Sequence, residues 1–317
     1  TGTKGRGLEL LYGANNNGFF FSSGGASKTD SAITIRGSTL DPGETGILAA
    51  YWSNEPNNLL MQATGAGGIL LEGTAVAAGS KYGIEMNGAS LLANSGDIKV
   101  DGGASGVRMG NWSAYGERAN VFGACSAVVG AVPRCTNSII SASTSDVLIV
   151  GDRVAAPTSG ANMVINTTGG VVVEPKGDSF AAATSWSSNA SGIANLRVGK
   201  DNGLSTASVT VGGTQSVVGN IEAYGLDVYP TGSFTLTGAG AQASKGMLFK
   251  AVQNVITSGA NYLRTNGSPI TFWADSDANG AGAIAVANGT SMCTKWNSTT
   301  SACATSGGAR SEEHTSE

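Results

Sequence analysis

Short apolar triplets recur at nearly regular steps between Gly67 and Asn111, and runs of Gly, Asn, Ser and Asp separate them. The triplets begin at residues 69, 76, 84, 91, 98 and 107, so successive steps are 7, 8, 7, 7 and 9 residues long. An apolar, β-prone triplet followed by turn-forming residues is typical of a strand that ends at a corner. Three such strands make a coil of about 22 residues, a repeat length at which stacked coils bury one continuous core. The pattern therefore predicts a parallel β-helix.

Three of these triplets carry one charged residue between two apolar ones. Because successive side chains of a strand point to opposite faces, we expect the apolar pairs in the core and the charges in solvent. The corners hold Gly88 and Gly102, which we expect to adopt positive φ angles, so that valine at either position would destabilise the coil. The alternating triplets are Ile84–Met86, Ile98–Val100 and Val107–Met109, and their central charges are Glu85, Lys99 and Arg108.

Strand candidates separated by turn formers continue over most of the chain, which predicts one elongated, all-β solenoid over residues 1–309. Strands are expected near residues 8–10, 19–21, 33–35 and 47–49 in the less regular first part, and again from Val147 onward. The expected organisation is irregular coils over 1–60, regular coils over 61–111, a loop insertion over 112–140, further coils over 141–289 and a second loop over 290–304.

Composition and charge exclude several classes of protein. Gly accounts for 48 residues and only 13% of the chain is charged, and the formal net charge is -4, so no basic stripe for nucleic acid is present. No run of eighteen apolar residues occurs, which excludes a typical membrane-spanning helix. We therefore expect no nucleic-acid partner and no membrane span.

The last eight residues, RSEEHTSE, differ in composition from the rest of the chain and resemble a translated sequencing adapter. We expect residues 310–317 to be a non-native tail and the chain to be a fragment of a longer protein. The tail contains His314, which is the only histidine. Without it the chain has neither the commonest general base nor the commonest metal ligand, which excludes Ser-His-Asp, Cys-His and His-zinc sites.

The four cysteines form two pairs, each with a spacing of ten residues. This spacing predicts two disulfide-closed loops, Cys125–Cys135 and Cys293–Cys303, in a protein of an oxidising compartment. Four free thiols in a reduced protein are the alternative. A zinc site of four thiolates is disfavoured because neither pair has the short spacing of two to four residues.

Four segments between residues 147 and 290 stand out: EPKGDSF at Glu174–Phe180, LRVGK at Leu196–Lys200 followed by SVTVGG at Ser208–Gly213, VVGNIEAYGLDV at Val217–Val228, and the run Ser268–Gly282. In order and spacing they resemble the repeat region of large secreted bacterial adhesins of the filamentous-haemagglutinin type, and residues 65–111 are similar to it more loosely. The resemblance implies a right-handed parallel β-helix, export to the cell surface and adhesion, and it supplies no catalytic residues.

Candidate chemistry is sparse. Asp275, Asp277, Asn279 and Gly280 have the opening of a calcium-binding loop, but its twelfth position is Val286 where a bidentate Glu is needed. A β-helix corner of Asp, Asn and Gly is the alternative, because these residues tolerate left-handed backbone angles. We expect no other metal and no cofactor.

Five tryptophans could stack on sugars. Trp52, Trp112 and Trp296 lie in expected loops and are the binding candidates, whereas Trp186 and Trp273 are expected to pack in the protein.

The sequence thus favours a non-enzymatic, secreted or cell-surface bacterial adhesin fragment, a rigid stalk that adheres through its loops. Its expected partners are host or environmental surfaces, glycans and other cells, and its open ends could associate end to end. The alternative is a polysaccharide-acting β-helix enzyme, such as a lyase or a tailspike-like glycosidase, although the acidic residues are dispersed along the chain. An ice- or mineral-binding solenoid would need a regular threonine ladder, and the threonines look scattered.

Overall fold

The computed structural model describes residues 5–12, 20–28, 30–51, 59–76, 81–110, 119–125, 140–157, 163–238, 245–257, 259 and 261–304. The predicted tail at residues 310–317, Trp52, Trp112 and Cys135 lie outside these ranges, as does most of the insertion predicted at residues 112–140.

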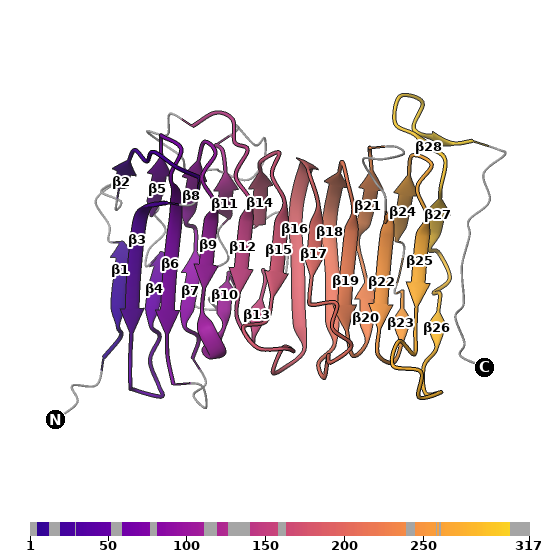
Figure 1. The fold of residues 1–317 in the computed structure, drawn as a ribbon, viewed down its shortest axis with the longest axis horizontal. Coiled ribbons are helices and arrows are strands. Elements are labelled where there is room, and N and C mark those ends of the chain that lie inside the picture. Colours follow the sequence, from indigo (N-terminus) through magenta and orange to yellow (C-terminus); the bar gives the residue numbers. More distant parts are fainter. Residues whose placement is uncertain are drawn as a thin grey trace.

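The described chain folds into a parallel β-solenoid, which confirms the predicted fold class (Figure 1). Its coils stack along the long axis, and every strand pairing within the two long sheets is parallel. The nine-stranded sheet contains one strand from each coil. In chain order these strands are β3 (Ser31–Ser38), β6 (Gly68–Thr74), β9 (Ile98–Asp101), β12 (Val147–Val150), β15 (Val171–Glu174), β17 (Leu196–Val198), β19 (Ile221–Gly225), β22 (Met247–Ala251) and β25 (Ile270–Trp273).

The eighteen-stranded sheet forms the opposite side and takes two strands from most coils, arranged as two rows. Two long strands, β16 (Thr184–Ile193) and β18 (Val209–Val217), cross both rows. The first row also contains β1 (Leu8–Tyr12), β4 (Ile47–Tyr51), β7 (Ile84–Asn87), β10 (Val107–Met109), β13 (Val154–Ala155), β20 (Val228–Pro230), β23 (Val255–Ile256) and β26 (Ile284–Ala285). The second row also contains β2 (Phe20–Ser23), β5 (Leu60–Ala63), β8 (Ser90–Ala93), β11 (Asn120–Gly123), β14 (Met163–Asn166), β21 (Ser233–Leu236), β24 (Tyr262–Thr265) and β27 (Ser291–Cys293).

The predicted strands are present with one exception. No strand forms at Ala75 and Val76, and Ile69 pairs with Ile98, so this coil is longer than the predicted 22 residues. A strand in a solenoid needs strand partners in the adjacent coils, and the preceding coil has a corner at this level, between Thr39 and Thr45. Val76 therefore has no strand in the preceding coil with which to form backbone hydrogen bonds.

One apolar core runs through the whole solenoid, built from the inward-facing side chains of both sheets. Lys99 and Arg108 are partly exposed on the outside, as their triplets predict. The prediction is wrong for Glu85, which is 5% exposed. Leu48 pairs with Glu85 in the neighbouring strand, so the two side chains point to the same face of the sheet. Leu48 is 1% exposed, which shows that this outward face is covered here.

A second, smaller apolar cluster buries part of the outward face of the second row. It lies on the outside of β5, β8, β11 and β14, where the chain on either side of the insertion packs back over the sheet through Ala124 and Ile140. The alternation of a strand identifies two faces but does not say whether the outer one remains in solvent. The cluster contains Leu60, Leu92, Val121, Ala124, Ile140 and Val164.

Side-chain ladders of Asp and Asn hold the corners together from one coil to the next. Asn195 Oδ1 accepts a hydrogen bond of 2.9 Å from the backbone N–H of Asn220, and Asn220 Oδ1 accepts one of 3.1 Å from the N–H of Gly246. At another corner, Asp227 Oδ1 accepts from the N–H of Asn254 at 3.1 Å. Each contact satisfies a backbone donor that the turn leaves unpaired.

The predicted positive φ angle is present at one of the two corner glycines and absent at the other. Gly88 has a φ of 81°, as predicted. Gly102 has a φ of -87°, so the predicted positive angle is wrong there. Gly102 is nevertheless required, because a Cβ atom at this position would lie 2.1 Å from the carbonyl oxygen of Gly106.

Replacing Gly102 by alanine is therefore expected to lower the free energy of unfolding by about 1–3 kcal/mol, because the added methyl group must displace backbone. Gly177→Ala is the matched control, since its Cβ would meet nothing closer than 3.9 Å, and we expect it to change stability by less than about 0.5 kcal/mol. Urea denaturation compares the two variants. Equal effects would contradict the tight corner at Gly102.

Candidate functional site

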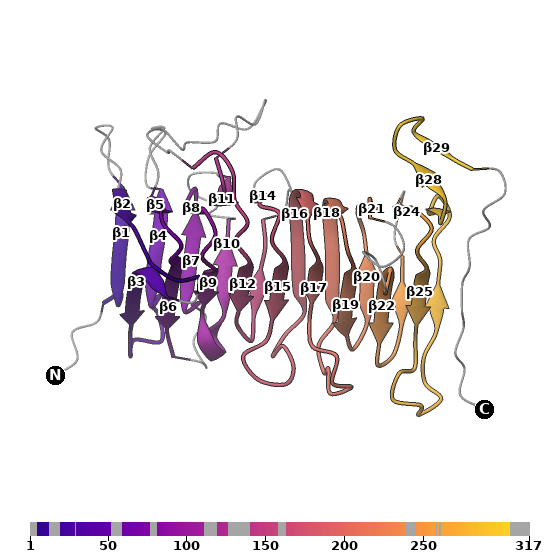
Figure 2. The same ribbon diagram turned by 45° about the horizontal axis from the view of Figure 1, so that its top comes forward.

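The C-terminal end of the solenoid carries a small antiparallel hairpin, which projects beyond the ends of the neighbouring strands (Figure 2). It consists of β28 (Trp296–Asn297) and β29 (Ala302–Cys303) and directly follows the last strand of the second row, β27. Cys293 and Cys303 form a disulfide with an S–S distance of 2.00 Å and a Cα–Cα distance of 5.9 Å. This confirms the predicted pairing of these two cysteines, whereas the predicted partner of Cys125 lies outside the described residues.

Local hydrogen bonds shape the loop of this hairpin. Asn297 Oδ1 accepts from the backbone N–H of Thr299 at 2.9 Å and of Thr300 at 3.2 Å, which turns the chain back toward β29. The N–H of Ala304 donates to the carbonyl oxygen of Lys295 at 3.1 Å and closes the base of the hairpin. Strands of only two residues are marginal in isolation, so the disulfide supplies much of the order here.

Trp296 is held in place by cation–π contacts. The Arg264 guanidinium carbon lies 4.1 Å from the centroid of the Trp296 ring and 4.4 Å from that of Tyr262. Arg264 and Tyr262 belong to β24, so this contact fixes the hairpin against the solenoid. A cation over an aromatic face contributes about 0.5–1 kcal/mol at exposed sites.

A pocket of about 500 Å³ opens between the hairpin and the second row of the large sheet. Trp296 lines it together with amide and hydroxyl side chains, an arrangement suited to a sugar ring, which offers both C–H faces and hydroxyl groups. Of the three predicted tryptophans, Trp296 thus lies in a candidate site, whereas Trp52 and Trp112 are outside the described residues. The pocket is lined by Thr235, Leu236, Thr237, Asn266, Gly267, Lys295, Trp296, Asn297, Ser298, Thr299 and Ala304.

Trp186 and Trp273 were expected to pack in the protein, and each has a packing role. Trp186 is 0% exposed in the core. Trp273 lies on the outside of β25, where Lys250 Nζ is 4.4 Å from its ring centroid.

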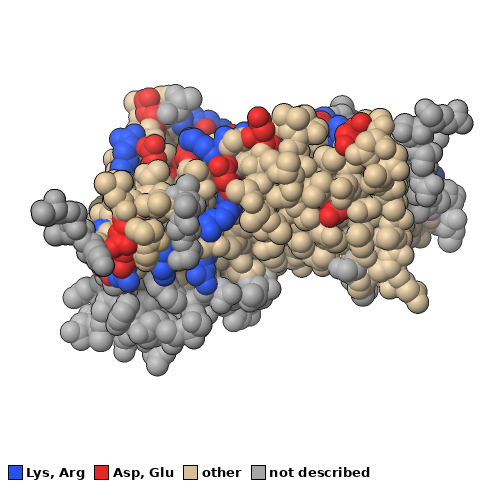
Figure 3. Space-filling view, turned by 90° about the horizontal axis from the view of Figure 1, so that it is seen from below, with Lys and Arg blue, Asp and Glu red and all other residues tan. Residues whose placement is uncertain are grey.

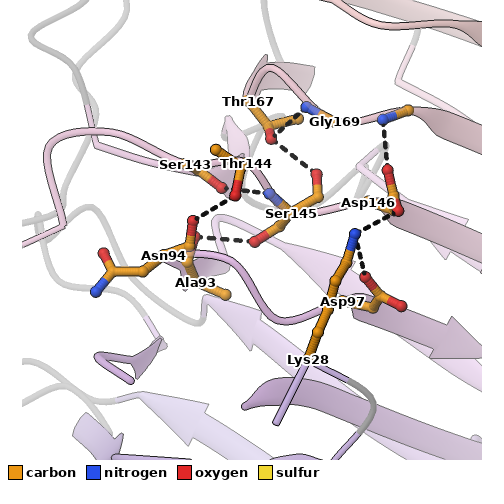
Figure 4. A network of polar contacts seen from close by, with 11 residues as sticks. Lys28, Ala93, Asn94, Asp97, Ser143, Thr144, Ser145, Asp146, Thr167 and Gly169 are labelled. Carbon is orange, nitrogen blue, oxygen red and sulfur yellow. Dashed lines mark hydrogen bonds and ion pairs between the residues drawn. The ribbon is translucent and has the colours of Figure 1, made fainter. Parts of the chain in front are cut away.

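A second candidate lies on the nine-stranded sheet, near the N-terminal end (Figure 4). Lys28 Nζ lies 2.8 Å from Asp146 Oδ2 and 3.4 Å from Asp97 Oδ1, and thereby joins three different coils. The acidic residues look dispersed in the sequence, and no spacing signal could have brought these three together, because the lengths of the intervening coils decide which residues stack. The Lys28 cluster, as we call Lys28, Asp97 and Asp146, was therefore missed by sequence reasoning.

The Lys28 cluster borders a groove of about 400 Å³ whose lining includes Leu70, Leu148 and Val172. Burial by itself would raise the pKa of Asp146, but hydrogen bonds from Lys28 and from the backbone N–H of Gly170 hold that pKa below its ordinary value. A general acid in glycoside cleavage needs a raised pKa. The direction at Asp146 is the opposite of what a general acid needs. Its contacts with Lys28 and Gly170 connect neighbouring coils.

Further hydrogen bonds connect neighbouring coils at the corner beside the Lys28 cluster. Ser145 Oγ donates to the carbonyl oxygen of Ala93 at 3.0 Å, and Thr167 Oγ1 donates to that of Ser145 at 2.7 Å, which links successive coils (Figure 4).

Charged side chains of both signs gather over the N-terminal half of the face seen in Figure 3. At the end of β9, Asp101 is 4% exposed and its carboxylate lies 3.1 Å from Lys99 Nζ and 2.8 Å from Lys176 Nζ. Burial opposes ionisation of Asp101, yet the two lysines and the N–H of Gly103 lower its pKa below the ordinary value. The folded state therefore favours the ionised carboxylate.

This lowered pKa predicts a pH dependence of stability. Because the folded pKa of Asp101 lies below its unfolded value of about 3.9, its contribution is fully present above about pH 5 and is lost as the pH falls through the folded pKa. In urea denaturation across pH, Asp101→Asn should be less stable than the parent at neutral pH, and the difference should shrink below about pH 4. Asp178→Asn removes an exposed carboxylate and is the control. A constant difference at all pH values would contradict the ion-pair role.

The candidate calcium loop forms a corner turn. Asp275 Oδ1 accepts hydrogen bonds from the backbone N–H of Asn279 at 2.9 Å and of Gly280 at 3.1 Å, and Asp275 has a φ of 54°. Asp277 Oδ2 accepts from Asn279 Nδ2 at 2.7 Å. Among the described residues, no group of three His, Cys, Asp or Glu side chains is placed to hold a metal ion. These contacts are those of the Asp, Asn and Gly corner that is the alternative to a calcium loop.

In comparisons with known proteins, no family model, no curated protein and no solved structure matches the chain. In the part of the chain that the structure describes, no helix is long and apolar enough to cross a membrane.

Proposed function

We propose that this chain is part of a secreted or cell-surface bacterial adhesin, in which the β-solenoid is a rigid, non-enzymatic stalk and the C-terminal hairpin contacts the target. The observation that carries the proposal is the hairpin itself. Its disulfide and the Arg264 contact hold Trp296 beside a polar pocket at one end of an elongated scaffold. An aromatic ring presented on a preorganised loop is a common means of recognition, because little entropy is lost on binding.

The solenoid supports the mechanical part of the proposal. Parallel ladders connect each coil to the next along the whole axis, and Asp and Asn side chains add hydrogen bonds at the corners. A stalk of this kind presents its contact site at a distance from its anchor. When many copies are present on one surface, their individually weak contacts combine into multivalent binding of high avidity.

Attachment under flow tests this proposal. Beads coated with the chain are passed over surfaces that carry glycans, proteins or mineral, and retention is measured. We expect retention on at least one surface and its loss in Trp296→Ala. Trp273→Ala is the matched control, because that ring also stacks on a cation, at 4.4 Å, but lies away from the hairpin pocket. Absence of retention on every surface, or equal retention of both variants, would overturn the proposal.

The alternative, a polysaccharide-acting enzyme, is tested with the same preparation. Neutral and acidic polysaccharides are incubated with the chain, and new reducing ends and unsaturated lyase products are measured. The non-enzymatic proposal expects neither product. Product release that disappears in Asp97→Asn would instead assign catalysis to the groove beside Lys28.

A further inference from the structure

We infer that the groove beside the Lys28 cluster binds an aliphatic primary ammonium ion, with the ammonium group at Asp30 and the alkyl chain along the sheet. The groove has a volume of about 400 Å³ and lies on the outside of the nine-stranded sheet. It is separate from the hairpin pocket, so this binding goes beyond the proposed adhesion and does not depend on it.

The floor of the groove is one row of aliphatic groups that crosses four coils. Leu70 pairs with Lys99, and Lys99 pairs with Leu148. Leu148 pairs in turn with Val172, and all four residues line the groove and are partly exposed. Lys99 Nζ lies 3.1 Å from the Asp101 carboxylate, so the ammonium group of Lys99 is already paired and its aliphatic stem completes the row. Since paired strands are about 4.8 Å apart, the row is about 14 Å long.

The rim of the groove carries an excess of negative charge. The charged residues that line the groove are three aspartates and two lysines, namely Asp30, Asp97, Asp146, Lys28 and Lys99. Lys28 Nζ is shared between Asp97, at 3.4 Å, and Asp146, at 2.8 Å (Figure 4). Asp30 is exposed, and no hydrogen bond or ion pair with another described residue holds its carboxylate. An ammonium ion that enters the groove therefore meets a carboxylate that is not already neutralised.

Asp30 lies at one end of the aliphatic row. Its backbone carbonyl oxygen accepts a hydrogen bond of 2.7 Å from the N–H of Gly68, which precedes Leu70 by two residues. The other end of the row lies beside Gly170, in the coil of β15, where a Cβ atom would meet nothing closer than 3.5 Å. A ligand with its ammonium group at Asp30 therefore extends its apolar part from Leu70 toward Gly170.

The composition of the lining favours this ligand class over others. The described residues that form the groove include no aromatic side chain on which a sugar ring could stack. In the described part of the chain, no group of three His, Cys, Asp or Glu side chains is placed to hold a metal ion. An organic anion would meet three carboxylates and lysines that are already paired. An aliphatic ammonium ion uses both the apolar row and the unpaired carboxylate of Asp30.

Calorimetric titration of the full chain with butyl-, hexyl- and octylammonium, and with the alcohols of the same chain lengths, tests the inference. We expect each ammonium ion to bind about three- to fivefold more tightly than its alcohol, a modest ratio because Asp30 is exposed to water. Each added methylene should tighten binding by about threefold, since it is buried on the apolar row. Asp30→Asn should remove the preference for the ammonium ion and keep the dependence on chain length. Asp178→Asn, which removes an exposed carboxylate outside the groove, is the control.

A second variant tests the position of the alkyl chain. Gly170→Val fills the far end of the row at a site that has room for a side chain, so it should weaken octylammonium more than butylammonium. Gly177→Val is the matched control, because its Cβ would meet nothing closer than 3.9 Å and it does not line the groove.

Each part of the inference has an outcome that overturns it. Absence of binding by every amine, equal binding of amine and alcohol, or a preference that persists in Asp30→Asn overturns the ammonium site. Equal affinity for butyl- and octylammonium, or octylammonium binding unaffected by Gly170→Val, overturns the aliphatic row as the binding surface. None of these results bears on adhesion, which is measured separately through Trp296→Ala.

Discussion

Phe249→Ala is expected to lower the free energy of unfolding by about 3–5 kcal/mol, the usual cost of removing a buried aromatic side chain. Phe249 is 0% exposed and lies between two other core rings, with centroid distances of 5.9 Å to Phe234 and 5.6 Å to Phe272. The stack joins the last coils of the solenoid, and a cavity in its middle would remove packing from both neighbours. Urea denaturation followed by circular dichroism measures the loss.

Leu248→Ala is the matched control for this experiment. Leu248 directly precedes Phe249 in the same strand but faces outward and is partly exposed, so its truncation should cost only about 1 kcal/mol. If both variants lost the same stability, the assignment of Phe249 to the core face would be wrong.

Removing the hairpin disulfide is expected to loosen the hairpin selectively. Closing a loop of about ten residues removes about 3 kcal/mol of unfolded-state entropy in the chain-entropy model. The double variant Cys293→Ser, Cys303→Ser should therefore increase hydrogen exchange at the amides of Thr299 and Thr300 by about 100-fold, since each 1.4 kcal/mol is a factor of ten. Those two amides donate to Asn297 within the loop.

The core strands provide the internal reference. Amides of β18 and β22 are hydrogen-bonded in the parallel ladders, far along the chain from the hairpin, and their exchange should be unchanged. A variant is preferable to a chemical reductant, because Cys125 is also in a disulfide. Unchanged exchange at Thr299 and Thr300 would mean that the Arg264 contact alone holds the hairpin.

Local sequence determined the solenoid. Apolar triplets such as Ile98–Val100 and the Gly, Asn and Asp residues between them specify strands and corners through short-range geometry, which is the same in every coil. The Cys293–Cys303 disulfide was predictable for the same reason, because its two cysteines are close in the chain.

Only the tertiary structure decided which residues from different coils meet. Lys28, Asp97 and Asp146 form one cluster because coils of unequal length place them side by side. The insertion between Asp97 and Asp146 lengthens one of these coils and has no periodic signal in the sequence. Likewise, Glu85 is buried because its outer face is covered, and Trp296 gains a pocket because Arg264 of an earlier coil holds it there. Period and turn chemistry are local properties, whereas stacking between coils and the covering of a face depend on contacts that the local pattern does not encode.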